Sequence, residues 1–265
     1  MRLCSIASGS SGNCIYTGSG HTHLLVDAGI SAKRVEAGLR ALQVDGKEID
    51  GLLITHEHSD HIQGAGVLAR RYGIPIYATG GTIARMKTVK SLGAVDESLY
   101  HVICADRRFT IGDVEVEPFS VSHDAAEPVA YRFTCGNRSV AVATDMGVYT
   151  DYIVERLQGL DVLLLEANHD IRMLQAGPYP YPLKQRILGE CGHLSNESAG
   201  QLLCRLLHDR MKKIYLGHLS KENNYAELAY ETVKLEIDLG AVKYKAGDFD
   251  IQVAERDCRS EICEW

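Results

Sequence analysis

Three histidines and one aspartate lie within six residues of the chain, as His56, His58, Asp60 and His61 in the run His-Glu-His-Ser-Asp-His. Imidazole nitrogen and carboxylate oxygen are the donors that Zn²⁺ and similar divalent cations take. In extended or turning backbone, residues two apart share a face, so His56 and His58 can bind one ion while Asp60 and His61 reach a second. The spacing predicts a site for two metal ions. A histidine-rich surface loop is the alternative, and the apolar residues before the motif disfavour it.

Regular elements on both sides of the motif must hold it in place. Residues 51–55 (Gly-Leu-Leu-Ile-Thr) predict a short buried strand that delivers the side chains onto the following turn. Apolar residues at helical spacing from Ile62 to Tyr72, with Gly73 as the stop, predict one helix that begins at the ligands. The positive end of that helix would favour an anionic ligand at the site.

The length and composition limit the classes of protein to which this chain can belong. A chain of 265 residues with no linker, repeat or low-complexity tract predicts a single domain over residues 1–265. The formal net charge of -7 argues against binding nucleic acid by bulk electrostatics, although it leaves room for a local basic rim. Scattered cysteines without a Cys-x-x-Cys pair, and no apolar run near 18 residues, indicate reduced thiols in a cytoplasmic protein away from the membrane.

Alternating and continuous apolar runs predict a mixed α/β (α+β) chain, in which further donors follow strand ends. We expect strands at 2–7, 14–16, 22–27, 51–55, 74–78, 100–103, 114–121, 129–135, 139–144, 161–166, 213–216, 242–245 and 249–254, and helices at 32–42, 62–72, 82–92, 197–208 and 222–239. A two-ion centre needs about eight protein contacts, of which the first motif gives four. His123, Asp145 and His218 lie at later strand ends and supply candidates for the rest.

Three other stretches carry groups that could assist the site. The loop from Ser8 to Asn13 is rich in glycine and serine, so it is either a plain turn or an anion contact through Ser10 and Asn13. Asp27 ends a strand, where it could orient a metal-bound imidazole or simply cap a turn. Gly-His-Leu-Ser occurs twice, at 192–195 and 217–220.

The His-x-His-x-Asp-His run resembles the first signature of the metallo-β-lactamase superfamily. Nearly the whole chain, from Ser-Gly-Ser-Ser-Gly-Asn to Gly-Pro-Tyr-Pro-Tyr-Pro, resembles the compact bacterial WalJ/YycJ-type group, which is associated with 5′-to-3′ exonuclease action on DNA. The resemblance implies an αββα sandwich of two mixed sheets flanked by helices. It also implies two ions: His56, His58 and His123 at the first, Asp60, His61 and His218 at the second, and Asp145 as the bridge.

The same resemblance implies roles for residues around the ions. His193 would be the general acid and Ser195, at a helix N-terminus, the phosphate cradle. Glu166 would orient a metal-bound imidazole, and Asp60 would assist as a base. Together the expected substrate-binding residues are Ser10, Asn13, Ser195 and Ser220. Only about seventy residues separate Asp145 from His218, too few for the β-CASP cap domain of the larger RNA-processing relatives.

The residues predict a metal-dependent hydrolase, and the resemblance implies a phosphodiester hydrolase, a 5′-to-3′ DNA exonuclease that uses water activated by two divalent ions. Zn²⁺ and Mn²⁺ suit the donors, and Fe is a further candidate. The expected partner is single- or double-stranded DNA with a free 5′ end, and the oligomeric state stays open. One alternative is a hydrolase of small esters, thioesters or cyclic phosphodiesters, which the acidic charge mildly favours. Another is a metal-stabilised scaffold without catalysis.

Overall fold

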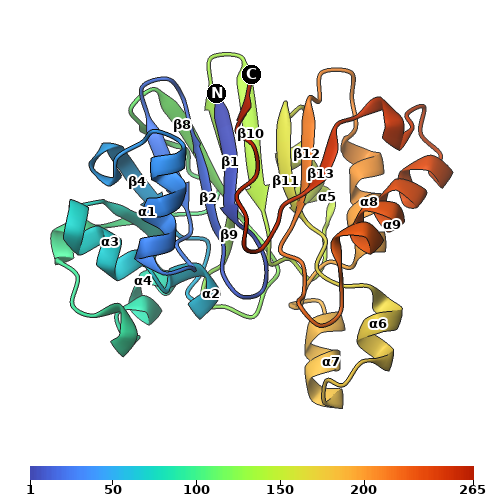
Figure 1. Ribbon diagram of the computed structural model, residues 1–265, viewed down its shortest axis with the longest axis horizontal. Coiled ribbons are helices and arrows are strands. Elements are labelled where there is room, and N and C mark those ends of the chain that lie inside the picture. The colour runs from blue at the N-terminus through green and yellow to red at the C-terminus, as the bar shows by residue number, and fades with distance from the viewer. The chain divides into compact units, whose positions relative to one another are not determined.

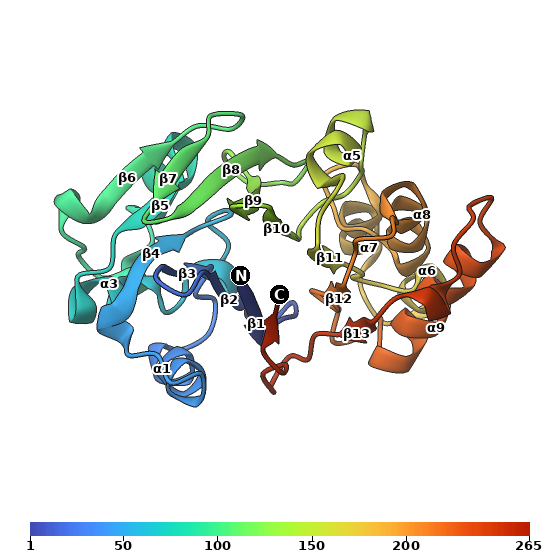
Figure 2. The same ribbon diagram turned by 90° about the horizontal axis from the view of Figure 1, so that it is seen from above.

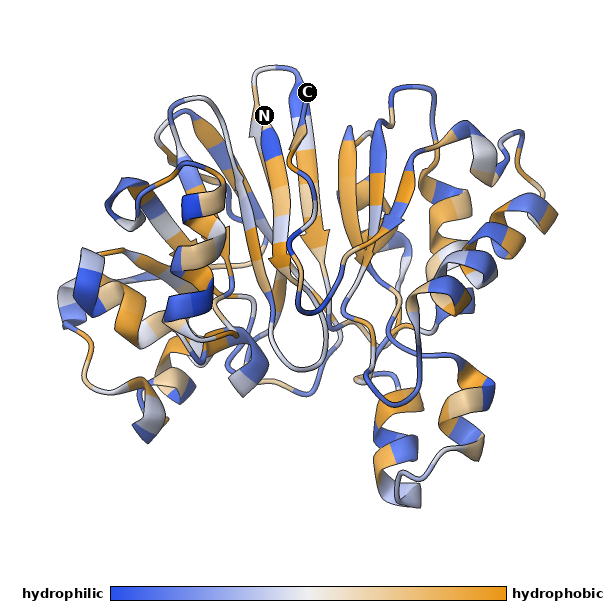
Figure 3. Cartoon of the chain, in the orientation of Figure 1, coloured by the Kyte–Doolittle hydropathy of each residue, from blue (hydrophilic) through white to orange (hydrophobic).

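The computed structural model describes residues 1–265, and the chain divides into two compact units. Unit 1 comprises Met1–Ser120, Ala125–Arg138 and Glu255–Trp265, and unit 2 comprises Val121–Asp124 and Ser139–Ala254. The strands in both are hydrophobic along most of their length, whereas the outer faces of the helices carry hydrophilic residues (Figure 3).

Unit 1 contains a seven-stranded mixed sheet in the order β14-β1-β2-β3-β4-β5-β6. The strands are β1 Arg2–Ala7, β2 Cys14–Gly18, β3 His23–Val26, β4 Ile49–Leu53, β5 Ile76–Thr79, β6 Tyr100–Ile103 and β14 Cys263–Glu264. Neighbours from β14 to β3 are antiparallel, and those from β3 to β6 are parallel. The parallel half brings the carboxyl ends of β3, β4 and β5 to one edge, where the histidine motif follows β4.

Helices cover this sheet and contribute side chains to its core. They are α1 Ala32–Ala41, α2 Ser59–Ile62, α3 Ala65–Tyr72 and α4 Gly80–Met86, with single 3₁₀ turns at Gly46–Glu48, Lys90–Leu92 and Glu97–Leu99. Ser31 caps α1 by accepting a hydrogen bond from Arg34 N. Buried Val35 and Leu39 of α1 and Leu68 of α3 belong to one apolar cluster with the strands, and both helices flank the sheet in Figure 1.

Unit 1 also holds an antiparallel ladder of three strands, β7 Phe109–Ile111, β8 Val114–Ser120 and β9 Val129–Cys135. Tyr131 of β9 is fully buried, and its hydroxyl donates to Ile54 O at 2.7 Å. Val129 N likewise donates to Thr55 O at 3.1 Å. This ladder thus contacts the backbone on which the histidine motif begins.

Unit 2 is built on four parallel strands, β10 Arg138–Ala143, β11 Val162–Glu166, β12 Lys213–Gly217 and β13 Ile251–Val253. Its helices are α5 Asp151–Leu157, α6 Ile171–Ala176, α7 Tyr181–Leu188, α8 Asn196–Leu206 and α9 Ala226–Leu239, with a 3₁₀ turn at Ala246–Asp248. Figure 2 shows α8 and α9 on one face of these strands. The carboxyl ends of β10, β11 and β12 share an edge, from which further candidate donors project.

Several expected elements differ from the structure. The single helix expected after the motif is two helices, because Gly64 separates α2 from α3. A Cβ on Gly64 would lie 2.4 Å from Ile30 O, and Gly64 N donates to Ala28 O, so the backbone there is committed to another segment. Residues 242–245 are not a strand, the helix expected from 222 begins at Ala226, and β7, β14 and α5 to α7 were not expected.

None of the helices has both the length and the apolar composition that a membrane span requires.

Candidate metal centre

Unit 1 brings together the imidazoles of the first motif. His56 Nε2 lies 3.0 Å from His58 Nδ1, and the rings of His56 and His61 have centroids 4.1 Å apart. His56 and His61 are buried, and the Asp60 carboxylate lies 3.7 Å from His61 Nε2. Four of the predicted ligands therefore form one compact group on the turn that follows β4.

Asp27 contacts the imidazole of His61. Its Oδ2 accepts a hydrogen bond from His61 Nδ1 at 2.7 Å, and its two oxygens also accept bonds from the amide and hydroxyl of Thr55. Burial raises the pKa of the Asp27 carboxyl, and the neighbouring His61 opposes that shift. Because Nδ1 is engaged by the carboxylate, Nε2 is the nitrogen that His61 presents to a cation.

Backbone packing from the Asp27-Ala-Gly turn holds the motif in place. A Cβ on Gly29 would lie 1.6 Å from Asp60 O, so only glycine allows this approach. Ala28 N donates to His61 O at 2.8 Å, and Asn13 N donates to Asp60 O at 2.8 Å. These bonds fix the carbonyls of both residues and hence the direction of their side chains.

Asn13 is part of this packing. Its side-chain oxygen accepts from Gly9 N at 3.0 Å, its amide nitrogen lies 3.2 Å from His61 Nε2, and the residue is buried. The structure thus gives Asn13 a role in shaping the loop, whereas Ser10 in the same loop is exposed. Their predicted contacts with substrate stay predictions.

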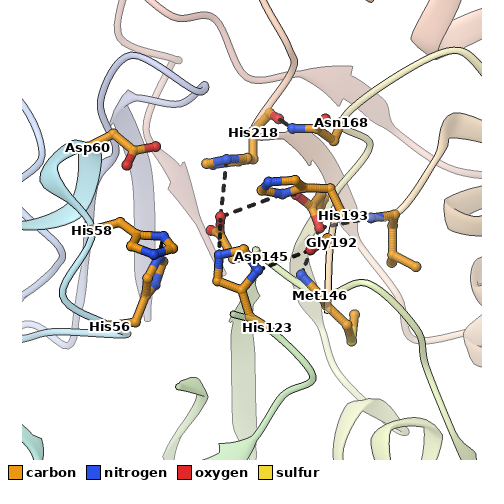
Figure 4. A network of polar contacts seen from close by, with 12 residues as sticks. His56, His58, Asp60, His123, Asp145, Met146, Asn168, Gly192, His193 and His218 are labelled. Atoms are coloured by element: carbon orange, nitrogen blue, oxygen red, sulfur yellow. Dashed lines mark hydrogen bonds and ion pairs between the residues drawn. The ribbon is translucent and has the colours of Figure 1, made fainter. Parts of the chain in front are cut away.

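In unit 2, three imidazoles surround one oxygen of Asp145 (Figure 4). The distances to Asp145 Oδ1 are 3.2 Å from His218 Nε2, 3.6 Å from His193 Nδ1 and 3.7 Å from His123 Nε2. Asp145 follows β10 and His218 follows β12, so parallel pairing around β11 places them at one edge. The predicted ligands of this unit therefore lie together.

The backbone around these donors is held in an unusual conformation. Asp145 has φ 58° and His218 has φ 56°, which is the left-handed region that non-glycine residues rarely adopt. Asn168 supports this conformation, since its Nδ2 donates to His218 O at 2.8 Å. A backbone carbonyl orients the side chain of His123. Its Nδ1 donates to Gly192 O at 3.0 Å, which directs Nε2 toward Asp145.

Glu166 contacts His193. Its Oε1 lies 2.7 Å from His193 Nδ1, and its Oε2 accepts from Met146 N and Leu194 N. The sequence led us to expect that Glu166 orients a metal-bound imidazole. In the structure Glu166 is hydrogen-bonded to the imidazole of His193, the expected general acid. Glu166 is fully buried, whereas the His193 side chain is 20% exposed, the largest value among the donors of this unit.

The serine of each Gly-His-Leu-Ser copy accepts a hydrogen bond from a backbone amide three residues later in the chain. Ser195 Oγ accepts from Ser198 N at 3.1 Å and caps α8, as expected for a helix N-terminus. Ser220 Oγ accepts from Asn223 N at 3.2 Å. Their contacts with a phosphate stay predictions.

Sequence reasoning gave no role to Asn168 and named His169 only as a lesser candidate beside Glu166. His169 is buried, its Nδ1 has no hydrogen-bond partner, and desolvation lowers its pKa to about 4. The run Glu-Ala-Asn-His after β11 was the only signal for either residue, and a strand end alone does not say which of its three polar side chains points inward.

The donor chemistry of unit 2 fits a divalent cation. One ligand atom from each of Asp145, Glu166, His193 and His218 lies within 4.8 Å of the others. Converging lone pairs and carboxylates would repel one another in a buried site without a positive charge between them. Asp145 and His218 offer donors directly, and Glu166 is committed to backbone amides and to His193.

The beta-lactamase superfamily domain model matches residues 22–218. The chain belongs to this superfamily. It is 46% identical over 247 residues to a protein named exodeoxyribonuclease WalJ from Streptococcus pneumoniae serotype 2 strain D39, with 92% of each chain covered. It is 43% identical over 228 residues to one named exodeoxyribonuclease YycJ from Bacillus anthracis, with 86% of each covered. The family resemblance found in the sequence is confirmed.

Solved structures confirm the fold expected for this superfamily, two mixed β-sheets flanked by helices. The metallo-β-lactamase fold protein YhfI from Bacillus subtilis aligns with a TM-score of 0.70 at 19% identity, covering 98% of each chain. Human tRNase Z, short form, aligns with a TM-score of 0.66 at 16% identity, covering 100% of each. At these identities the likeness concerns the fold alone.

Proposed function

We propose that this chain is a metal-dependent exodeoxyribonuclease that digests DNA from a free 5′ end, on single- or double-stranded substrates, in the cytoplasm. The names of the relatives at 43% and 46% identity support a nuclease acting on DNA. The polarity of digestion and the type of strand come from the sequence-based expectation. The single-domain organisation over residues 1–265 without a β-CASP cap belongs to the same proposal.

One observation supports a phosphodiester as the bond that the protein cuts. Glu166 holds His193 next to Asp145, within a group of metal donors. A departing 3′-oxygen of DNA is a poor leaving group, so its release needs a proton donor close to the metal ligands. With Nδ1 bonded to Glu166, Nε2 is the nitrogen of His193 that would carry that proton, and His193 is the donor of unit 2 with the most access to solvent.

The proposed metal ligands form two sets that share one residue. The proposed sets are His56, His58 and His123 for one ion, Asp60, His61 and His218 for the other, and Asp145 as a ligand to both. Zn²⁺ or Mn²⁺ suits these donors, with Fe as a further candidate. A pair of bound divalent cations would lower the pKa of water and withdraw charge from a phosphoryl oxygen.

The remaining work falls to residues of this chain. A water oxygen forms the new bond to phosphorus and the bond from phosphorus to the 3′-oxygen breaks. Asp60, whose side chain is 24% exposed, accepts the proton of the attacking water. His193 gives its Nε2 proton to the 3′-oxygen, so that a nucleoside 5′-monophosphate leaves and the shortened strand keeps a 5′-phosphate. Asp27 and Glu166 keep His61 and His193 in the required orientation.

DNA labelled separately at each end tests the proposal. With Mn²⁺ or Zn²⁺ present, a 5′-labelled strand should release labelled mononucleotide at once, while a 3′-labelled strand shortens gradually. His58→Ala should abolish both signals, and His21→Ala, at an exposed histidine of the same unit, should retain them. Immediate release of label from the 3′ end would refute the polarity, and no release with any divalent metal would refute the nuclease.

The net charge of -7 favours a second candidate, a hydrolase of small cyclic phosphodiesters or esters, because such substrates need no extended basic surface. Hydrolysis of bis-p-nitrophenyl phosphate without any release from DNA would support this second candidate.

A further inference from the structure

Helices α6 and α7 form an arm, residues 171–188, that projects from the rest of unit 2 (Figure 1). Leu174 is the only residue of the two helices that is buried. Tyr181 is 72% exposed and Leu188 is 38% exposed, and Figure 3 shows hydrophobic stretches along α7. An ordered segment that keeps aromatic and aliphatic side chains in water is typical of a surface that binds a partner.

The charge of the arm identifies the kind of partner. Between Ile171 and Gly189 the sequence has three cations, Arg172, Lys184 and Arg186, and no aspartate or glutamate. Because Arg186 is paired with Asp124, Arg172 and Lys184 supply the positive charge of the arm, on a chain whose formal net charge is -7. Exposed aromatic rings beside cations are the combination that binds single-stranded nucleic acid, since bases stack on the rings and phosphates contact the cations.

The base of the arm is bonded to the loop that carries His193. His193 N donates to Ile187 O at 3.1 Å, and Gly192 N donates to Gly189 O at 2.9 Å. Arg186 forms an ion pair with Asp124, the neighbour of His123. A strand bound along the arm would therefore be held by an element in direct contact with the proposed proton donor.

The arm also has internal features that keep its shape. Lys184 Nζ, on α7, donates to Gln175 O at the end of α6, at 2.7 Å. The connection Gly-Pro-Tyr-Pro contains two prolines, and Pro180 precedes α7 at its N-cap, with Pro182 in the first turn. Fixed backbone lowers the entropy that an unstructured loop would lose on binding.

We propose that the α6–α7 arm binds the single-stranded part of a DNA substrate, with Tyr181 stacking on a base and Arg172 and Lys184 contacting phosphates. This inference rests on the proposed function for its substrate, and it adds the surface that compensates for the acidic charge of the chain. Tyr181 contributes to DNA binding, whereas the metal ligands carry the chemistry. The two contributions can therefore be measured apart.

Fluorescence anisotropy of the metal-loaded protein with fluorescein-labelled oligo-dT that carries phosphorothioate linkages, which resist hydrolysis, measures binding apart from cutting. Tyr181→Ala should weaken the Kd about tenfold, and Tyr181→Phe should retain most of the affinity, because base stacking is worth about 1–3 kcal/mol. The matched control is Tyr244→Ala. Tyr244 lies between Lys243 and Lys245 and precedes β13, at the opposite edge of the parallel strands from His218, so its loss should leave the Kd unchanged.

Hydrolysis separates the arm from the nuclease. With metal present, the ratio of kcat/KM on single-stranded DNA to kcat/KM on bis-p-nitrophenyl phosphate should fall about tenfold in Tyr181→Ala, in line with the lost stacking energy. An unchanged Kd in Tyr181→Ala, or an equal loss in Tyr244→Ala, would overturn the arm while leaving a working nuclease standing. Tyr181-dependent binding by a protein that never cuts DNA would support the arm and overturn the nuclease.

Discussion

Oε1 of Glu166 lies 2.7 Å from Nδ1 of His193, and the carboxylate is fully buried while the imidazole reaches solvent. Such a contact fixes the orientation and the tautomer of the imidazole. The sequence could place both residues near the site, but only the structure joins them. The proposed role of His193 in protonating the leaving group follows from this contact.

His193→Ala should lower kcat on DNA by at least about a hundredfold, as expected for the loss of a general acid. The loss should be much smaller on the p-nitrophenyl ester of thymidine 5′-monophosphate, because p-nitrophenolate departs without a proton. Glu166→Gln should show the same dependence on leaving group with a smaller loss. Equal losses on the two substrates would mean that His193 acts in binding or folding and not as the acid.

Asp27→Ala should weaken metal binding about 10- to 100-fold, since it removes the carboxylate that orients His61. Titration of the purified apoprotein with Zn²⁺ or Mn²⁺, followed by calorimetry, measures the affinity. Asp50→Ala is the matched control, because Asp50 is an exposed carboxylate of the same unit that bonds to a backbone amide of His23. Unchanged metal affinity in Asp27→Ala would show that Asp27 does not support metal binding.

Gly29→Ala should destabilise the protein by about 3 kcal/mol or more, because the added methyl group would meet the backbone oxygen of Asp60. The displaced Asp60 and His61 should also bind metal less tightly. Gly20→Ala is the control, since a Cβ there has no atom within 4 Å. Urea unfolding of the two variants measures the difference, and equal stabilities would contradict the close packing.

His169 should make the stability of the fold depend on pH. Burial lowers its pKa to about 4 from the ordinary 6.5, so the unfolded chain binds this proton more readily than the folded one. The stability is therefore complete above pH 6.5 and falls as the pH drops from 6.5 toward 4. Between pH 7.5 and pH 5 this one group should account for about 2 kcal/mol.

His169→Gln should remove that part of the pH dependence. Urea unfolding of the wild type and the variant at both pH values gives the difference, in which the contributions of the other histidines cancel. His101→Gln, at an exposed ring in unit 1, serves as the control. A wild type and a His169→Gln variant that lose stability in parallel would show that His169 keeps its ordinary pKa.

Most strands and the capped helices could be predicted from the sequence, because their buried faces repeat at the period of the element. Ser195 was expected at a helix N-terminus and caps α8, and Ser31, which directly precedes the helix expected at 32–42, caps α1. Helices α6 and α7 had no such signal, since they bury almost nothing and their prolines resemble those of a loop. Strand β14 has only two residues, too few for any periodicity.

The residue types of the site could be predicted, but its hydrogen bonds could not. The sequence placed Asp27 and Glu166 at strand ends, and the structure shows that one contacts His61 and the other His193. Asn168 was missed because its contribution is a bond to the backbone of His218, which leaves no pattern in the sequence.

Asp27, Asp145 and His218 all adopt positive φ, at 60°, 58° and 56°, although none is glycine. Glycine would relax the backbone at each of these positions while deleting a carboxylate or an imidazole from the site. Selection of variants for thermal tolerance alone would therefore tend to enrich glycine here and yield robust proteins that no longer react. Laboratory evolution of this chain toward heat resistance should screen for turnover at every round.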